Sequence, residues 1–277
     1  MSIAYYNGEF SSLSDIKIPL TDRALFFGDG IYEALIARNG RAHLLEKHLE
    51  RFYRNAELLG IPCYMGREAL TGLINEALFR SGEETALIYF QMTRFSERRA
   101  HAVFSRERSN FLLTVTAQPM PDIERRIRLV TYPDLRYKYC NIKTLNLLPS
   151  VIAADYAERN QADEAVFLRD GIVTECSHSN ISALINGVLY THPKNELILP
   201  GIAREELLSE CKRLGIPHRE EAFSAELLYS ADALIVTSST RLASLAESID
   251  RKNLPSPTEK AIELVENLYE NFINFTN

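Results

Sequence analysis

Asn-Gly and Asp-Gly pairs between short apolar runs constrain the fold of this chain more than any other feature. Such a pair is typical of the short loop that joins two antiparallel strands. The pairs are Asn7-Gly8, Asn39-Gly40, Asp170-Gly171 and Asn186-Gly187. Elsewhere, apolar residues spaced three and four apart predict amphipathic helices over 43–59, 67–80, 204–214 and 259–272. Because hairpins and helices occur together in each half, we predict an α+β (mixed α/β) fold instead of a βαβ array.

The remaining apolar runs predict further strands, and two prolines predict a domain boundary. Strands are expected over 31–38, 86–93, 111–116, 128–132 and 233–237, with a tight turn over 22–30 and a short helix over 151–159. Pro119 and Pro121 stiffen the chain and interrupt both helix and strand. For a chain of 277 residues we therefore predict an N-terminal α/β domain over 1–117, a linker over 118–123 and a C-terminal α/β domain over 124–277.

The composition excludes several classes of protein. Apolar residues make up 46% and charged residues 25%, which suits a packed core, and the net charge of -6 comes without a basic block. This charge argues against nucleic acid or an anionic membrane as a partner. No apolar run approaches the roughly 18 residues of a membrane span, and the first residues lack the pattern of a secretory signal. The four cysteines lack metal-ligand spacing, so we expect free thiols, no bound metal and a cytoplasmic protein.

Lys143 stands out among the ionisable residues, because its neighbours in the sequence are largely apolar. Ile142, Leu145, Leu147 and Leu148 lie within five positions of it. Most lysines are solvated, and a surface lysine on a loop is the ordinary alternative here. A lysine shielded from water favours its neutral form, a nucleophile that forms Schiff bases with carbonyl compounds or with pyridoxal phosphate.

Three other segments carry groups suited to binding anions. Gly201-Ile202-Ala203 opens a predicted helix, whose free amides and dipole favour an anion. Thr237-Ser238-Ser239-Thr240 offers hydroxyl groups to phosphate oxygens. Arg99 and His101 are two residues apart on an extended segment, so they point the same way and can grip one carboxylate. Taken singly, each segment has an ordinary alternative as a helix start, a polar loop or a solvated charged loop.

Taken together, these segments resemble the class IV, or fold-type IV, pyridoxal-phosphate aminotransferases over nearly the whole chain. The family signature is matched in order and spacing by Glu175-x-Ser177-x-x-Asn180, Leu189-Tyr190-Thr191 and Leu199-x-Gly201-Ile202-x-Arg204. The chain departs from it at Ser182, where the family usually has an aromatic residue, a change that removes no functional group. The resemblance implies a two-domain architecture with the cofactor pyridoxal 5'-phosphate between the domains.

The resemblance also implies a role for each matching residue. Lys143 would form the Schiff base and carry the proton, and Glu175 would keep the pyridine nitrogen protonated. Leu199 would pack against the cofactor ring. The cofactor phosphate would be bound by Arg51, by the amides of Ile202 and Ala203 and by the hydroxyls of Ser238 and Ser239.

Among the activities of this family, the sequence favours transamination of D-amino acids, such as D-alanine, with a 2-oxo acid such as 2-oxoglutarate. Arg99 and His101 are similar to the pair with which D-amino-acid aminotransferases hold the substrate carboxylate, and Tyr32 matches the tyrosine that completes the site. In that family the pair comes from the partner subunit, so a homodimer with shared active sites is implied. Arg98 is an alternative to Arg99 for this assignment. Ala34-Leu35, which follows Tyr32 and Glu33, does not indicate how large the substrate pocket is.

Three alternatives stay open. Within the family, the chain would be a branched-chain L-amino-acid aminotransferase or an aminodeoxychorismate lyase. Outside these activities, it would be a non-catalytic protein that binds the cofactor or an amino acid, which the complete set of Lys143, Glu175 and Arg51 argues against.

Overall fold

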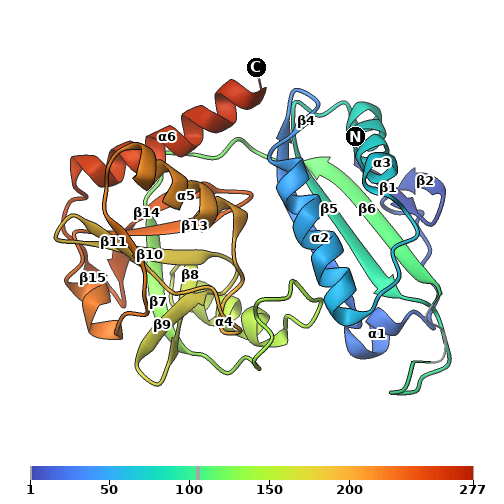
Figure 1. Ribbon diagram of the computed structural model, residues 1–277, viewed down its shortest axis with the longest axis horizontal. Coiled ribbons are helices and arrows are strands. Elements are labelled where there is room, and N and C mark those ends of the chain that lie inside the picture. Colours follow the sequence, from blue (N-terminus) through green and yellow to red (C-terminus); the bar gives the residue numbers. More distant parts are fainter. Residues whose placement is uncertain (1, 104–106, 277) are drawn as a thin grey trace. The chain divides into compact units, whose positions relative to one another are not determined.

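The computed structural model describes residues 2–103 and 107–276, which fold into two compact units (Figure 1). Unit 1 contains the chain up to Met120, residues 142–146 and the last residues from Phe275, and unit 2 contains residues 121–141 and 147–274. The chain passes between them after Met120, inside the predicted linker 118–123. Unlike the predicted division, residues 142–146 belong to unit 1, because their backbone bonds to Gly30 and Tyr32 hold them there.

Unit 1 is an antiparallel sheet with helices packed on it (Figure 1). Among the described residues, its six strands have the order β2-β1-β6-β5-β3-β4. The strands are β1 (Ile3–Tyr6), β2 (Glu9–Ser12), β3 (Gly30–Arg38), β4 (Arg41–Ala42), β5 (Thr85–Arg94) and β6 (Ser109–Ala117). The helices are α1 (Arg23–Phe27), α2 (Leu45–Leu59) and α3 (Arg67–Ser81).

The core of unit 1 is formed by every second residue of the central strands, which points to the helices, and by one apolar stripe on α2. The buried residues of β5 and β6 include Ala86, Ile88, Phe90, Met92, Phe111, Leu113 and Val115. On α2, Leu49, Phe52 and Ala56 belong to the same cluster, and the rings of Phe52 and Phe90 are 4.9 Å apart. Burying one such large side chain contributes about 1.5–3 kcal/mol, so packing fixes α2 on the sheet.

Unit 2 is built around one mixed sheet of nine described strands. Eight of them have the order β12-β11-β10-β13-β14-β7-β8-β9, and β15 pairs with β14. The strands are β7 (Ile127–Pro133), β8 (Glu164–Arg169), β9 (Ile172–Cys176), β10 (Asn180–Ile185), β11 (Val188–Thr191), β12 (His218–Glu220), β13 (Ala233–Ser238), β14 (Leu242–Ile249) and β15 (Lys252–Asn253). The helices are α4 (Leu148–Arg159), α5 (Ile202–Arg213), the 3-10 helix η1 (Ala225–Tyr229) and α6 (Glu259–Thr276).

The predicted α+β class is confirmed, and the predicted helices and hairpins lie near their expected bounds. Several features differ from the sequence-based expectations. Residues 23–27 form the helix α1 where a tight turn is expected, and β12, β14, β15 and η1 have no counterpart among the predicted elements. In addition, β7 and β8 pair in parallel across α4, so unit 2 contains one βαβ crossover within its mixed sheet.

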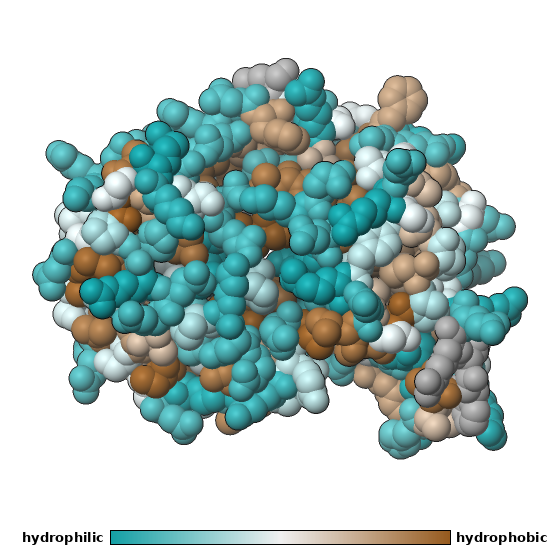
Figure 2. All heavy atoms as spheres, in the orientation of Figure 1, coloured by the Kyte–Doolittle hydropathy of each residue, from teal (hydrophilic) through white to brown (hydrophobic). Residues whose placement is uncertain are grey.

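The molecular face drawn in Figure 2 is mostly hydrophilic, and its hydrophobic residues form groups separated by polar ones. No helix in the described ranges is both long enough and apolar enough to span a bilayer. All four cysteines are free thiols, as expected. The predicted cytoplasmic location stays a prediction.

Candidate active site

Lys143 is held against the start of β3 in unit 1. The Tyr32 N–H donates to the Lys143 carbonyl at 3.0 Å, and the Leu145 N–H donates to the Gly30 carbonyl at 3.1 Å. With the backbone held in this way, Lys143 Nζ lies 4.2 Å from the centre of the Tyr32 ring. A Cβ atom at Gly30 would lie 2.8 Å from the Met92 carbonyl oxygen on β5, a backbone atom that cannot move aside, so this position requires glycine.

The surroundings of Lys143 are less apolar than the sequence suggests. Ile142 is buried in the core of unit 1, whereas Leu147 and Leu148 are exposed. Lys143 itself is half-buried. Its backbone is therefore anchored while its side chain stays within reach of a small molecule.

Next to Tyr32 on β3, Glu33 is the centre of a buried polar network. Arg51 Nε and Nη2 donate to the two Glu33 oxygens, each at 2.8 Å, and His48 Nδ1 lies 2.6 Å from Glu33 Oε2. All three residues are at most 4% exposed. Burial by itself would raise the pKa of Glu33, but Arg51 and His48 outweigh it and lower the pKa to about 2. An ionised glutamate that the sequence analysis did not identify thus orients Arg51, the predicted phosphate ligand.

We expect this network to lose part of its stabilising effect in acid. The pKa of Glu33 in the folded protein, about 2, lies below its ordinary value of 4.5, so the ionised form stabilises the fold above pH 4.5. The difference of 4.5 minus 2 corresponds to about 3 kcal/mol, which is lost as the pH falls toward 2. Urea unfolding of wild-type protein and of Glu33→Gln should give a stability difference that shrinks from pH 5 to pH 3. A difference that stays constant over that range would contradict the assignment.

Arg99 and His101 lie in the segment that follows β5 in unit 1, and Phe27 at the end of α1 brings them together. The Arg99 guanidinium carbon and the centre of the His101 ring each lie 5.3 Å from the centre of the Phe27 ring. Arg99 and His101 are exposed, and both lie in bends, not in the extended segment that the sequence analysis predicted. Tyr32, the third predicted member of this set, stacks on Tyr89 with ring centres 5.5 Å apart.

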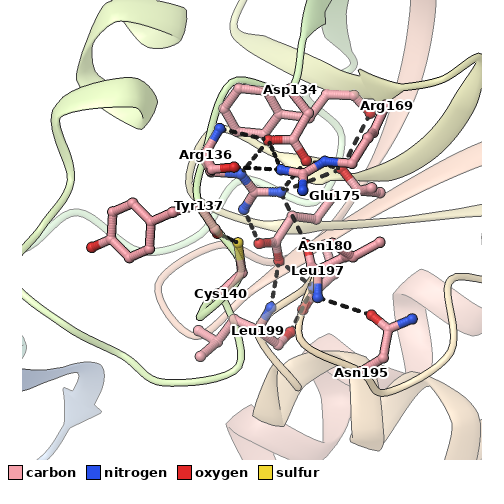
Figure 3. A network of polar contacts seen from close by, with 12 residues as sticks. Asp134, Arg136, Tyr137, Cys140, Arg169, Glu175, Asn180, Asn195, Leu197 and Leu199 are labelled. Atoms are coloured by element: carbon pink, nitrogen blue, oxygen red, sulfur yellow. Dashed lines mark hydrogen bonds and ion pairs between the residues drawn. The ribbon is translucent and has the colours of Figure 1, made fainter.

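Glu175 lies near the end of β9, at the centre of a polar network in unit 2 (Figure 3). Its Oε1 accepts from Arg136 Nη1, and its Oε2 accepts from Asn180 Nδ2 and from the Leu199 N–H, both at 3.0 Å. Burial raises the pKa of Glu175 to about 7, although the ion pair with Arg136 acts in the opposite direction. A carboxyl group with this pKa is suited to share a proton with a weak base at neutral pH.

Arg136 is held on its other side by Asp134 (Figure 3). Arg136 Nε and Nη2 donate to the two Asp134 oxygens, both at 2.9 Å, and Arg169 Nη2 lies 3.1 Å from Asp134 Oδ1. The Arg136 guanidinium carbon also lies 4.3 Å from the centre of the Phe167 ring. These contacts fix the guanidinium that orients Glu175. The sequence analysis identified neither Arg136 nor Asp134.

Helix α5 begins without a side-chain cap, so the amides of Ile202 and Ala203 have no partner within the helix. Gly201 precedes them in an extended conformation. A Cβ atom there would lie 2.0 Å from Asn180 Oδ1, so glycine is required. Because Asn180 also donates to Glu175, it links the carboxylate to this helix start.

Ser238 and Ser239 lie where β13 ends, also in unit 2. The Arg241 N–H donates to Ser238 Oγ at 3.2 Å and closes the turn. The buried Glu164 accepts from Arg241 Nη1 at 2.9 Å and from Ser179 Oγ at 2.5 Å. Glu164 therefore ties the turn after β13 to the turn after β9.

Comparison with known families decides which kind of protein has this arrangement. The family described as amino-transferase class IV matches residues 30–249, a range that includes Lys143, Glu175 and the start of α5. This chain belongs to the class IV aminotransferase family. The resemblance seen in the sequence is thereby confirmed.

Several relatives of this class IV aminotransferase have more specific names. The D-alanine aminotransferase of Staphylococcus epidermidis is 36% identical over 257 residues, which are 92% of this chain and 91% of the relative. The solved branched-chain amino acid aminotransferase of Escherichia coli has a TM-score of 0.89 at 19% identity and covers 99% of this chain and 94% of its own. The fold IV transaminase of Curtobacterium pusillum has a TM-score of 0.83 at 23% identity, with coverage of 97% and 99%. The two structures show that the fold is shared.

Ser182 is a position where this class IV aminotransferase departs from the usual pattern. The residue is fully buried on β10, and its Oγ has no hydrogen-bond partner within the described part of the chain. A buried hydroxyl without a partner costs roughly 1–3 kcal/mol. We expect Ser182→Ala to raise the free energy of unfolding by about 1 kcal/mol in urea. A less stable variant would show that the hydroxyl has a partner, such as a buried water.

Proposed function

We propose that this protein is a pyridoxal-phosphate-dependent aminotransferase that transfers the amino group of D-amino acids, such as D-alanine, to a 2-oxo acid such as 2-oxoglutarate. The observation that carries the proposal is the similarity to a D-alanine aminotransferase over 92% of the chain at 36% identity. The presence of Arg99, His101 and Tyr32 agrees with it. The branched-chain enzyme of Escherichia coli, at 19% identity, shares the fold alone.

Each unit by itself presents groups that suit pyridoxal phosphate. The Lys143 amine is a nucleophile suited to its aldehyde. Glu175 is a buried carboxyl group suited to its ring nitrogen, and the open start of α5 is suited to its phosphate. When bound, the cofactor supplies an electron sink for the electrons of the substrate Cα–H bond. The proposed cofactor contacts are Arg51, the amides of Ile202 and Ala203, the hydroxyls of Ser238 and Ser239, and Leu199 against the ring.

Lys143 also moves the proton in this proposal. The Lys143 amine would take the proton from the substrate Cα and hold it at Nζ for its return to the substrate-derived product. The Tyr32 ring, 4.2 Å from Nζ, restricts where this amine can lie. Glu175, held by Arg136, would bind the ring nitrogen of the cofactor and favour its protonated form.

The hand of the substrate follows from where its carboxylate is bound. Lys143 removes a proton only from the side on which it lies, so the carboxylate position decides which enantiomer presents its α-hydrogen. We assign the carboxylate to Arg99, His101 and Tyr32, which leaves the α-hydrogen of the D-form facing Lys143. Arg99 supplies most of the free energy of carboxylate binding, because a charge-assisted, bidentate contact is stronger than a neutral one.

A homodimer, in which Arg99 and His101 serve the active site of the partner subunit, is part of the proposal. Unit 2 offers an apolar surface for such a contact, because α4 buries Ala153 and Ala157 and exposes larger apolar residues on its other side. The exposed apolar residues of α4 and of the segment before it are Leu135, Tyr137, Tyr139, Leu147, Leu148, Val151, Ile152 and Tyr156. Such a concentration is typical of a surface that binds another protein. Light scattering measures the oligomeric state, and a monomer would contradict this part of the proposal.

The test of the proposed function is a panel of D- and L-amino acids with 2-oxoglutarate, combined with two single variants. In the proposed site, the bound substrate and the partner subunit would shield the Arg99–carboxylate contact from water, and removing one partner of a buried ion contact costs about 3–5 kcal/mol. Arg99→Ala should therefore lower kcat/KM for D-alanine by about two to three orders of magnitude. Arg98→Ala is the matched control and should change it little, because Arg98 carries the same charge beside Arg99 but is not assigned to the carboxylate.

The outcomes separate the alternatives. Wild-type protein that prefers L-leucine to D-alanine would contradict the D-specific activity and favour a branched-chain aminotransferase. A D-preference lost in Arg98→Ala and kept in Arg99→Ala would retain the activity and move the carboxylate site by one residue. Protein without the yellow colour of bound pyridoxal phosphate would favour a non-catalytic role.

A further inference from the structure

Arg23, the first residue of α1, is a buried cation that holds a distant segment of unit 1. Its residue surface is 4% exposed, and its Nε donates to Asp29 Oδ2 at 2.8 Å. Its other nitrogens donate to the main chain after β5, Nη1 to the Ala100 carbonyl at 2.7 Å and Nη2 to the His101 carbonyl at 3.3 Å. A buried guanidinium requires such partners, and this one obtains two of them beside Arg99.

Phe27, at the other end of α1, contacts the same segment. The centre of its ring lies 4.9 Å from the Arg23 guanidinium carbon, 5.3 Å from that of Arg99 and 5.3 Å from the centre of the His101 ring. An aromatic face attracts a nearby cation. Helix α1 therefore contacts both the backbone of this segment and the two side chains assigned to the substrate.

Helix α1 is itself anchored to the sheet. Asp22 caps it, since its Oδ1 accepts from the Ala24 N–H at 2.9 Å. The same carboxylate accepts through Oδ2 from Thr93 Oγ1 at 2.8 Å and from Asn110 Nδ2 at 2.7 Å. Thr93 lies on β5 and Asn110 on β6, so α1 provides a support that moves only with the sheet.

We propose that Arg23 is a positioning residue for substrate binding, which holds the carbonyls of Ala100 and His101 against α1 and so sets where Arg99 and His101 meet the substrate carboxylate. This inference rests on the proposed function, which assigns Arg99 and His101 to that carboxylate. Arg23 acts through them and does not contact the substrate. Charged side chains of a loop bind well only when their supports keep them in place. Loss of Arg23 therefore weakens carboxylate binding more than it slows the proton transfer at Lys143.

Arg94 offers a matched control, because it also pairs with Asp29, the carboxylate that Arg23 contacts. Its Nε lies 3.0 Å from Asp29 Oδ2. Its Nη1 and Nη2 donate to the Gly60 and Leu59 carbonyls at 2.9 and 2.7 Å, at the end of α2. Arg94 thus makes the same kinds of contact as Arg23 without touching the segment that carries Arg99.

The test uses four proteins, each loaded with pyridoxal phosphate. They are the wild-type protein and the variants Arg23→Gln, Arg23→Lys and Arg94→Gln. KM and kcat are measured with D-alanine, an inhibition constant is measured for propionate, and brief exposure to trypsin measures cleavage after Arg98 and Arg99. In Arg23→Gln, the KM and the propionate constant should rise roughly 10- to 100-fold, because hydrogen bonds from a charged donor are lost. The kcat should change less than about threefold, and tryptic cleavage should become faster. Arg23→Lys should recover part of the affinity, and Arg94→Gln should resemble wild-type protein.

An unchanged KM and propionate constant in Arg23→Gln would overturn the role of Arg23, and so would an equal rise in Arg94→Gln. If Arg23→Gln does not fold, Arg23→Lys tests the same contacts, because it keeps the charge beside Asp29 but cannot donate to both carbonyls as the guanidinium does. A propionate constant in Arg23→Lys equal to that of wild-type protein would then overturn the inference. Failure of the proposed function looks different, since wild-type protein would not turn over D-alanine at all.

Discussion

Replacement of Lys143 by alanine is expected to abolish transamination almost completely. The variant loses the nucleophile and the proton carrier together, and general acid–base catalysis by itself contributes about 10²- to 10⁴-fold. We expect kcat to fall by more than about four orders of magnitude. The fold should survive, because backbone bonds hold this segment to β3. The measurements are kcat with D-alanine and 2-oxoglutarate, and the protein mass after reduction with borohydride in the presence of pyridoxal phosphate.

Lys138→Ala is the control for this experiment. Lys138 lies five residues earlier, its side chain is 70% exposed, and its Nζ lies 4.0 Å from Glu196. This variant should keep both the rate and the mass increase of the covalent adduct. An adduct that persists in Lys143→Ala would show that another lysine is the anchor.

Replacement of Glu175 by glutamine is expected to slow proton removal by about three orders of magnitude while the cofactor stays bound. Glutamine keeps the shape of the side chain and can still accept from the Leu199 N–H. It carries no charge, however, so the ring nitrogen is no longer kept protonated and the electrons at Cα lose their stabilisation. Single-turnover rates with D-alanine measure this step, and the absorbance of released cofactor measures occupancy.

Glu210→Gln is a suitable control in the same unit. Glu210 is also buried, and it forms an ion pair with Arg213 at 2.7 Å on α5. Its replacement removes one buried carboxylate from unit 2 without touching the Glu175 network, so the single-turnover rate should not change. Equal rates for wild-type protein and Glu175→Gln would remove Glu175 from the mechanism.

The elements that were predictable from the amino-acid order are those whose geometry is local. Asn7 adopts the left-handed conformation that a tight hairpin requires, and it joins β1 to β2 as expected. Helix α2 follows its apolar stripe, because residues three and four apart lie on one face whatever surrounds them. In both cases the determining contacts involve neighbours in the chain.

Strand β14 was not predictable in this way. Its sequence, Leu242 to Ile249, is rich in alanine and serine and lacks the alternation of a half-buried strand. It is a strand because β13 and β7 pair with its two edges and because nearly all of its residues are buried. The β-propensity of a segment depends on its neighbours in the sheet, and these come from distant parts of the chain.

The same distinction holds for the candidate site. Lys143, Glu175 and the Gly201 helix start were recognisable before folding, because the type and spacing of residues along a chain do not depend on its conformation. The supporting residues were not, since a glutamate or an arginine is most often solvated. Glu33 pairs with Arg51 across 18 positions, and Arg136 pairs with Glu175 across 39. Such side chains become buried and paired only where distant segments pack together and exclude water. The exclusion of water also shifts their pKa values, and it exists only in the folded chain.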